Sequence, residues 1–291
     1  MINRLALGTA QFGSRYGVAN RSGEVAASEL AAILETARTA GIEVCDTAAV
    51  YGDSESRLGA AGVGGWKIVT KLPPLPPSVI DAEQWVSDSV GQSLERLRQP
   101  ALWGVVLHRT DDLGGAHASA IYQGLQALRA RGVIRKIGLS VYSPSQLDAF
   151  WPRFDFDLVQ APLNVIDQRL VTSGWLARLH AAGAEVHARS AFLQGLLLMA
   201  AADRPAYFSR WAALFDRWQA WLDDRQIDAV KACLDFVRSH HGVSHAVVGV
   251  DTRAQLQGIL AAAGAPAIAT LPGEFASDDV DLIEPFRWQL T

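Results

Sequence analysis

The sequence has few of the features that mark secreted, membrane-spanning or metal-binding proteins. Only two of its 291 residues are cysteines, Cys45 and Cys233, and they lie far apart in the chain. Two such cysteines predict neither a disulfide framework nor a cysteine-based metal site. No apolar run reaches the roughly 18 residues of a membrane span, and the first residues lack the pattern of a signal peptide. We therefore expect a cytoplasmic protein with no membrane partner.

Charge of either sign is also scarce. Charged residues make up 19% of the chain, the net charge is −4, and there is no run of Lys and Arg, so nothing predicts a nucleic-acid partner. The hydrophobic fraction of 49% predicts a large core. The expected partner is a small-molecule substrate, and the sequence does not predict the oligomeric state. Because no linker or internal repeat divides the chain, we expect residues 1–291 to form a single domain.

Short apolar segments alternate with amphipathic ones along the whole chain. Strands are expected at 2–8, 42–46, 66–71, 102–108, 133–140, 156–160, 185–190 and 246–250. Helices are expected at 28–40 with Ser28 as N-cap, and at 53–60, 81–97, 117–131, 144–150, 170–182, 204–222, 226–240 and 252–263. Eight strand–helix units in about 290 residues predict an α/β fold, the closed (β/α)8 TIM barrel.

The alternative is an open, doubly wound sheet of the dinucleotide-binding kind. Such a fold requires a G-x-G-x-x-G segment directly after its first strand. The glycines at 59–65 precede a strand instead and lack that spacing. The open sheet is therefore disfavoured.

Polar side chains terminate successive strands of the predicted barrel. In a barrel of this type the carboxyl ends of the strands surround one site. Each of these polar residues alone could have a purely structural role, such as an ion pair between Asp46 and Lys71 or core packing of Tyr51. Their recurrence at consecutive strand ends favours a catalytic site. The strand-end residues are Asp46, Lys71, His108, Ser140, Gln160 and Arg189, with Tyr51 in the loop after the second strand.

The chemistry of these side chains suits the reduction of a carbonyl group. A lysine ammonium near a phenol lowers the pKa of the tyrosine, and a carboxylate keeps the lysine charged and in place. A histidine can donate a hydrogen bond to the carbonyl oxygen, so that the group as a whole protonates a developing alkoxide. The hydride must come from a cofactor, because no side chain supplies one. No spacing of ligands predicts a metal site.

Several segments together resemble the aldo-keto reductase family. They are Leu-Gly-Thr-Ala-Gln-Phe-Gly at 7–13, Asp-Thr-Ala-x-x-Tyr-Gly-x-Ser-Glu at 46–55, Ile-Gly-Leu-Ser at 137–140 and Gln-x-Pro-x-Asn at 160–164. The resemblance implies a barrel that binds an extended nicotinamide dinucleotide, NADP(H) or alternatively NAD(H). It also implies a catalytic tetrad of Asp46, Tyr51, Lys71 and His108, with Tyr51 as the general acid.

The same resemblance implies which residues hold the cofactor. Ser140 and Gln160 are expected to bind the nicotinamide carboxamide, with Asn164 nearby. The segment at 249–255 is expected to bind the adenosine phosphates, since the N–H groups of a helix N-terminus suit a phosphate; a simple N-cap at Asp251 or Thr252 is the alternative. The cofactor-binding candidates are Ser140, Gln160, Arg189, Gly249, Asp251, Thr252, Arg253 and Gln255.

Four positions depart from the family pattern. Arg189 stands where many members have an aromatic residue that stacks on the nicotinamide, and Val141 replaces a common asparagine. Asp251 stands where a basic residue often binds the 2′-phosphate of NADP, which makes NAD(H) credible, although Arg253 could compensate. Gly258 and Ile259 replace a frequent Glu-Asn pair.

Three further residues are candidates for the substrate pocket, and two other functions stay open. Phe12, Tyr16 and Arg109 follow strand ends and could contact substrate, with core packing or a surface charge as the alternative. A Schiff-base lyase that uses Lys71 is a second enzyme class. A non-catalytic barrel that binds the dinucleotide and reports redox state is a third function.

Overall fold

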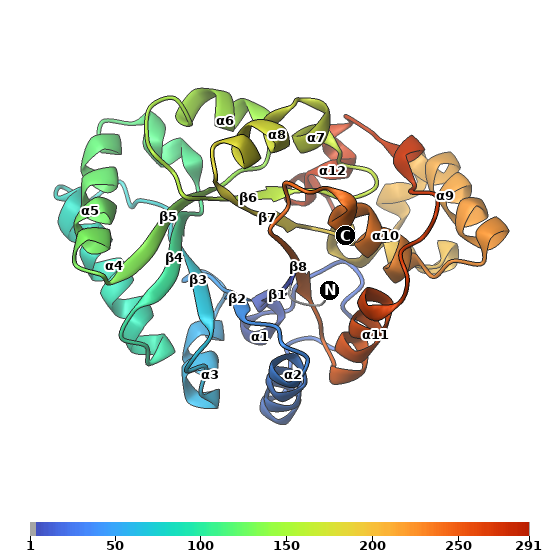
Figure 1. The fold of residues 1–291 in the computed structure, drawn as a ribbon, viewed down its shortest axis with the longest axis horizontal. Coiled ribbons are helices and arrows are strands. Elements are labelled where there is room, and N and C mark those ends of the chain that lie inside the picture. The colour runs from blue at the N-terminus through green and yellow to red at the C-terminus, as the bar shows by residue number, and fades with distance from the viewer. Residues whose placement is uncertain (1–3, 291) are drawn as a thin grey trace.

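The computed structural model describes residues 4–290, which form a closed barrel of eight parallel strands inside an outer ring of helices (Figure 1). Each strand pairs with the next one along the chain, and the last pairs with the first. The strands are β1 (Leu5–Gly8), β2 (Val44–Asp46), β3 (Lys67–Leu72), β4 (Leu102–Leu107), β5 (Ile134–Ser140), β6 (Leu158–Pro162), β7 (Glu185–Arg189) and β8 (His245–Gly249). The predicted (β/α)8 barrel is confirmed.

The helices follow the strands, and several lie close to their predicted positions. The α-helices are α1 (Ala10–Gly13), α2 (Ala27–Thr39), α3 (Ser54–Ala61), α4 (Ala82–Leu97), α5 (Ala118–Ala130), α6 (Pro144–Phe150), α7 (Arg169–Thr172), α8 (Trp175–Ala181), α9 (Ala212–Arg225), α10 (Ala229–Ser239), α11 (Arg253–Gly264) and α12 (Val280–Ile283). Short 3-10 turns lie at 110–114, 193–198, 201–203, 206–211, 273–275 and 285–287. Among the described residues, no helix is long and apolar enough to cross a membrane.

Three helix predictions need correction. Ser28 lies inside α2, whose N-cap is Ala26. The single helix expected at 170–182 is two helices, because Gly174 adopts a left-handed conformation between α7 and α8. The tryptophan-rich segment at 204–222 begins as a 3-10 turn and becomes α-helical only at Ala212. Trp218 and Phe215 of this segment are buried in the core.

Two layers of apolar side chains hold the barrel together. The larger lies between the strands and the surrounding helices, where Leu5, Leu7 and Ile33 are fully buried. The smaller lies inside the barrel and consists of Val69, Val106 and Leu158. Such interior packing makes the barrel a solid core rather than a pore, so that binding is confined to one end.

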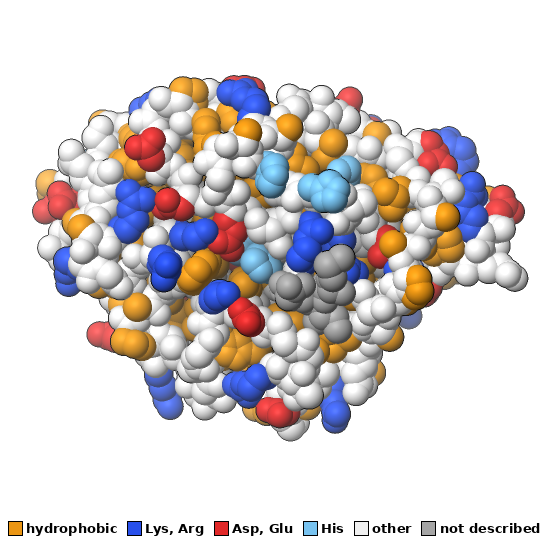
Figure 2. Space-filling view, in the orientation of Figure 1, with side chains coloured by type: hydrophobic (Ala, Val, Ile, Leu, Met, Phe, Trp, Pro, Cys, Tyr) orange, Lys and Arg blue, Asp and Glu red, His pale blue; other side chains and the backbone are white. Residues whose placement is uncertain are grey.

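A cluster of ionisable side chains occupies the N-terminal end of the barrel. The Glu185 carboxylate accepts hydrogen bonds from His187 Nε2 at 2.7 Å and Trp103 Nε1 at 3.3 Å, and it pairs with Lys136. His245 Nδ1 lies 3.6 Å from the same carboxylate. Histidine and charged side chains gather near the middle of the face shown in Figure 2.

This cluster brings three possible metal ligands together, one carboxylate and two imidazoles, but its carboxylate is already engaged. Ligand atoms of Glu185, His187 and His245 lie within 4.8 Å of one another. The Lys136 ammonium contacts the carboxylate, where it competes with any cation. We therefore interpret the group as an ionic cluster that joins β4, β5, β7 and β8.

The cluster makes the stability of the protein depend on pH. Burial lowers the pKa of His245 to about 4, and His187, Lys67 and Arg4 lower it further, whereas Glu185 opposes them. A lowered pKa means that the unfolded state takes up the proton first, so stability is present above pH 6.5 and is lost as pH falls to 4. We expect the wild-type protein to lose about 3 kcal/mol of unfolding free energy over this range through His245.

Urea unfolding at a series of pH values measures this effect. His245→Gln should flatten the pH dependence between 6.5 and 4, whereas His241→Gln, a change at an exposed histidine, should leave it unchanged. An equally steep decline in His245→Gln would show that other groups cause the loss.

Candidate active site

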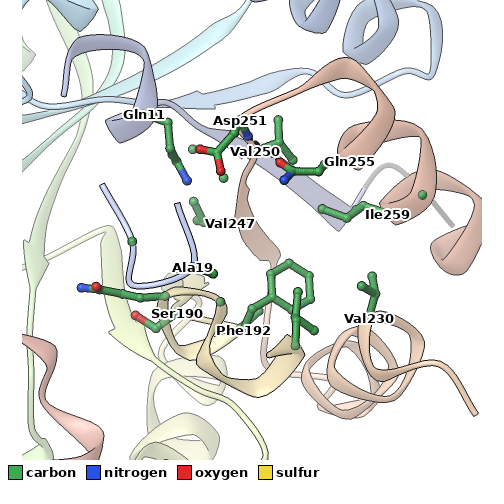
Figure 3. A pocket seen from close by; sticks show the side chains of 18 of the residues that line it. Gln11, Ala19, Ser190, Phe192, Val230, Val247, Val250, Asp251, Gln255 and Ile259 are labelled. Atoms are coloured by element: carbon green, nitrogen blue, oxygen red, sulfur yellow. Dashed lines mark hydrogen bonds between the residues drawn. The ribbon is translucent and has the colours of Figure 1, made fainter. Parts of the chain in front are cut away.

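A cavity of about 750 Å³ opens at the C-terminal end of the barrel. Residues from the ends of β1, β2, β7 and β8 and from the start of α10 and along α11 line it. One end contains Asp46, Tyr51 and Arg189, and the lining continues to an apolar part with Val230, Ile259 and Ile268. Figure 3 shows Gln11, Asp251 and Gln255 along one side, with Phe192 opposite them. A cavity of this volume lies within the usual range for small-molecule sites.

The loop after β1 forms part of the cavity wall. Tyr16, Gly17, Ala19 and Asn20 line the cavity. On one side the loop contacts the segment after β7, where Gln194 Nε2 lies 3.4 Å from the Tyr16 hydroxyl. On the other side Asn20 Nδ2 donates to Asp251 Oδ1 at 3.0 Å. The loop thus connects the β7 and β8 sides of the cavity.

The segment after β7 is held in an uncommon backbone conformation. Ser190, Leu193 and Gln194 have φ values of 61°, 47° and 54°, in the left-handed region that non-glycine residues rarely adopt. Each such residue costs of order 1–3 kcal/mol, and such residues cluster at functional sites. Ser190 and Gln194 line the cavity. The surrounding fold therefore stabilises a strained loop at the site.

Asp46 and Lys71 form a buried ion pair at the ends of β2 and β3. Lys71 Nζ lies 2.8 Å from both carboxylate oxygens of Asp46 and 2.8 Å from the carbonyl oxygen of Thr47. These three contacts use all three N–H donors of the ammonium group. The side chain of Lys71 is 2% exposed and that of Asp46 is 8% exposed. Gln160 Nε2 donates to the same Asp46 carboxylate.

Tyr51 is positioned by close contact between two loops. Gly13 lies against the backbone of the Tyr51 loop, and a Cβ atom at Gly13 would fall 1.9 Å from the Tyr51 carbonyl oxygen. Gly52 has φ +56° and would likewise collide with Gly13. Ser54 Oγ donates to the carbonyl oxygen of Thr9 at 2.9 Å and joins the two loops. Only glycine at both positions allows this packing.

The phenol and imidazole groups at this end are both neutral. Burial raises the pKa of Tyr51, the Asp46 charge raises it further, and Arg189 opposes both. Burial lowers the pKa of His108 to about 4, and the charges of Lys71 and Arg189 lower it further. The rings of Tyr51 and His108 meet edge to face at 5.9 Å between centroids. At neutral pH both groups can therefore donate a hydrogen bond.

One expected electrostatic effect is absent. The sequence predicted that Lys71 lowers the pKa of Tyr51, but the pKa is raised. Lys71 Nζ lies 4.9 Å from the centre of the Tyr51 ring, close enough to interact. Its charge is matched by Asp46, however, and desolvation of the half-buried phenol disfavours the phenolate. The local environment therefore favours the protonated phenol.

The remaining predicted residues separate into two groups. Tyr16, Arg189, Gly249, Asp251 and Gln255 line the cavity, together with the tetrad members Asp46 and Tyr51. Ser140 and Gln160 are opposite each other in the β5–β6 register and are buried beside the ion pair. Gln160 Oε1 is buried and has no partner among the described residues. Asn164 is buried, and its Nδ2 donates to Ser190 at 3.1 Å.

Four candidates lie elsewhere and need correction. Phe12 is fully buried in the hydrophobic core and does not reach the cavity. Arg109 lies at the surface, where its Nε donates a hydrogen bond to Asp112 Oδ1 at 2.9 Å. Thr252 is the N-cap of α11, and its hydroxyl accepts a hydrogen bond from Gln255 N at 3.2 Å. It therefore has the capping role that was given above as the alternative to phosphate binding. Arg253 lines a separate surface pocket with residues of α2.

The N-terminus of α11 also has fewer open N–H groups than the sequence suggested. Gln255 Oε1 accepts from the backbone N–H of Asp251 at 2.7 Å and of Thr252 at 3.3 Å. The N–H group of Arg253 donates to the Glu29 carboxylate of α2. These donors are therefore unavailable to a phosphate unless Gln255 and Glu29 move.

Sequence reasoning missed several cavity residues. The cavity is also lined by Asn20, Phe192, Asp228 and Lys231, which belong to loops or helix starts without a local motif. Gln11 lines it too; it lies in the segment 7–13 quoted above but was not chosen as a site residue. Asp228 is the N-cap of α10 and accepts from the N–H groups of Val230 and Lys231. Only the folded arrangement brings these segments together.

Comparison with known proteins identifies the chain. The sequence model of the aldo/keto reductase family matches residues 4–268. The chain belongs to the aldo/keto reductase family. A putative aldo-keto reductase from Pseudomonas aeruginosa is 25% identical, with 89% of each chain covered and a TM-score of 0.65.

A second solved structure supports the fold of this aldo/keto reductase. An aldo-keto reductase from Bacillus halodurans in its holo form is 17% identical, with a TM-score of 0.76, and the alignment covers 94% of this chain and 90% of that one. A search of curated proteins found no match. Family membership implies NAD(P)-dependent oxidoreductase chemistry on a small carbonyl compound.

Proposed function

We propose that this protein is an NAD(H)-dependent reductase that converts an aldehyde or ketone to the alcohol, with Tyr51 as the proton donor. The observation that carries the proposal is the position of a neutral, half-buried phenol beside the Asp46–Lys71 ion pair at one end of the cavity. A general acid in such a position contributes typically 10²–10⁴-fold to the rate.

The residues have separate roles in this proposal. Tyr51 holds the proton that passes to the carbonyl oxygen, and neutral His108 donates a hydrogen bond to the same oxygen. The Lys71 ammonium lies 4.9 Å from the centre of the Tyr51 ring, where it offsets part of the Asp46 charge that opposes formation of the phenolate. Asp46 holds the ammonium in place. Because its pKa is raised, Tyr51 carries its proton at neutral pH, as a general acid for reduction requires.

The cavity fits a nicotinamide dinucleotide, which supplies the hydride when bound. The nicotinamide belongs at the Tyr51 end, where the unpartnered Oε1 of Gln160 could accept from its carboxamide. An extended dinucleotide then places the adenosine along Asp251, Gln255 and Ile259. Gln160 and Ser140 would position the nicotinamide from the barrel floor.

The charges at the adenosine end favour NAD(H) over NADP(H). Asp251 lines this part of the cavity, and the Glu29 carboxylate covers the start of α11. Arg253, the one base that could have compensated, faces the separate surface pocket beside α2. Lys231 is paired with Asp235. A 2′-phosphate would therefore meet carboxylates rather than a free cation.

We expect NADH to bind at least roughly tenfold more tightly than NADPH, which corresponds to about 1.4 kcal/mol. Titration of protein fluorescence with each reduced cofactor measures this ratio. Asp251→Asn should reduce this preference for NADH, because the variant removes a negative charge that repels the 2′-phosphate of NADPH. Asp224→Asn, at an exposed position of α9, is the matched control.

Two results would refute the cofactor proposal. Tighter binding of NADPH would refute the selectivity, and binding of neither cofactor would refute the dinucleotide site itself. A Schiff-base reaction at Lys71 is disfavoured, because the three N–H donors of its ammonium are engaged. Turnover of an aldehyde with NADH distinguishes the reductase from a barrel that only binds the dinucleotide.

A further inference from the structure

The reacting end of the cavity carries an unneutralised positive charge. Lys71 is matched by Asp46, and His108 is neutral because its pKa is lowered to about 4. Arg189, at the end of β7, lines the cavity at this end. Within residues 4–290, its guanidinium makes no salt bridge, and its hydrogen bond goes to a backbone carbonyl. One positive charge thus remains beside Tyr51.

The Arg189 guanidinium is fixed in place but largely unsatisfied. One amino group donates to the carbonyl oxygen of Val141 at 2.8 Å, and the guanidinium carbon lies 4.4 Å from the centre of the Tyr142 ring. Its Nε atom is buried and has no partner among the described residues. A guanidinium has five N–H donors, and burying a charge without an acceptor is costly. The position is therefore organised to receive an acceptor.

The surrounding side chains also suit an anion. Three phenols, those of Tyr16, Tyr51 and Tyr142, lie within electrostatic range of one another and of Arg189. Tyr16 is 40% exposed, and its phenol is protonated at neutral pH and can donate. The opposite end of the cavity contains the carboxylates of Asp228 and Asp251. An anionic group of the substrate is therefore favoured at the Tyr51 end.

We propose that Arg189 binds a carboxylate carried by the carbonyl substrate, so that the enzyme acts on aldehyde acids or keto acids. The inference rests on the proposed reductase function and names its substrate class. The planar guanidinium matches the geometry of a carboxylate and can bind both of its oxygens. A substrate anchored at Arg189 presents its carbonyl group to the neighbouring Tyr51. Arg189 is then a substrate-binding residue, whereas the sequence suggested that it contacts the cofactor.

Binding of a simple acid tests the subsite without turnover. Calorimetry of the NAD⁺ complex with butyrate and with butyramide compares a carboxylate with a neutral group of similar shape. We expect butyrate to bind roughly 10- to 100-fold more tightly, as for a hydrogen-bonded charge. Arg189→Met should abolish this preference, and Arg189→Lys should retain part of it. Arg178→Met is the control, because Arg178 stacks on Trp175 on α8, outside the cavity.

A kinetic comparison completes the test. Succinic semialdehyde and its amide, 4-oxobutanamide, should differ by roughly 10- to 100-fold in kcat/KM in the wild type. In Arg189→Met the difference should disappear, through KM rather than kcat.

The outcomes separate this inference from the reductase proposal. Equal binding of butyrate and butyramide would overturn the carboxylate subsite, as would an Arg189→Met variant that loses affinity for NADH and keeps its preference for acids. If butyrate binds selectively but no carbonyl compound is reduced, the subsite stands and the reductase proposal fails. If both aldehydes are reduced equally well, the reductase proposal stands and the subsite is refuted.

Discussion

Tyr51→Phe is expected to lower kcat for aldehyde reduction by about 10²–10⁴-fold, the range for loss of a general acid. The substitution removes one hydroxyl and leaves the ring, so the packing of the loop against Gly13 is kept. The hydroxyl makes no hydrogen bond to the other described residues, and therefore the fold should be unaffected. The affinity for NADH should also change little.

Steady-state kinetics and cofactor titration together measure this outcome. Tyr122→Phe is the matched control, because its hydroxyl donates to Asp155 on the outside of the barrel. A near wild-type kcat in Tyr51→Phe would show that another group donates the proton to the carbonyl oxygen. His108 would then be the next candidate.

Lys71→Met is expected to cost about 3–5 kcal/mol of unfolding free energy, in addition to loss of activity. The substitution leaves the Asp46 carboxylate buried with its main partner removed, since both members of the pair are nearly inaccessible to solvent. The double variant Asp46→Asn/Lys71→Met should recover part of the loss, because no unpaired charge remains.

Lys67→Met is a control on the same strand. Lys67 begins β3 and pairs with Glu43 at the surface, with side chains 42% and 67% exposed. A surface pair of this kind contributes about 0–1 kcal/mol. Chemical denaturation of the four proteins gives the comparison. Equal losses in Lys71→Met and Lys67→Met would show that the buried pair does not stabilise the barrel.

The sequence predicted the barrel because its signals are local. Apolar segments such as Leu102–Leu107 are short and bounded by turns, and each precedes an amphipathic segment. Polar residues at the ends of β2 and β3 identified the Asp46–Lys71 pair for the same reason, since strand ends converge in a barrel. The pair at 2.8 Å agrees with that expectation.

The wrong predictions concern side chains whose positions depend on contacts between segments that are distant in the sequence. Arg109 was placed in the pocket because it follows His108, but Asp112 lies within reach and holds it at the surface. Arg253 was expected near the adenosine, yet the α11 start turns its side chain toward α2. The engagement of the α11 amides by Gln255 and Glu29 could not be read from local spacing. The charge left on Arg189 likewise became visible only when its neighbours were known.

Transfer of deuterium from NADH to an aldehyde tests the central claim most directly. NADH labelled at both C4 positions is incubated with succinic semialdehyde and the enzyme, and the alcohol is analysed by mass spectrometry. The proposed reaction predicts one deuterium on the former carbonyl carbon with the wild-type protein and almost none in the same time with Tyr51→Phe. Unlabelled alcohol, no alcohol, or equal labelling by the two proteins would contradict it.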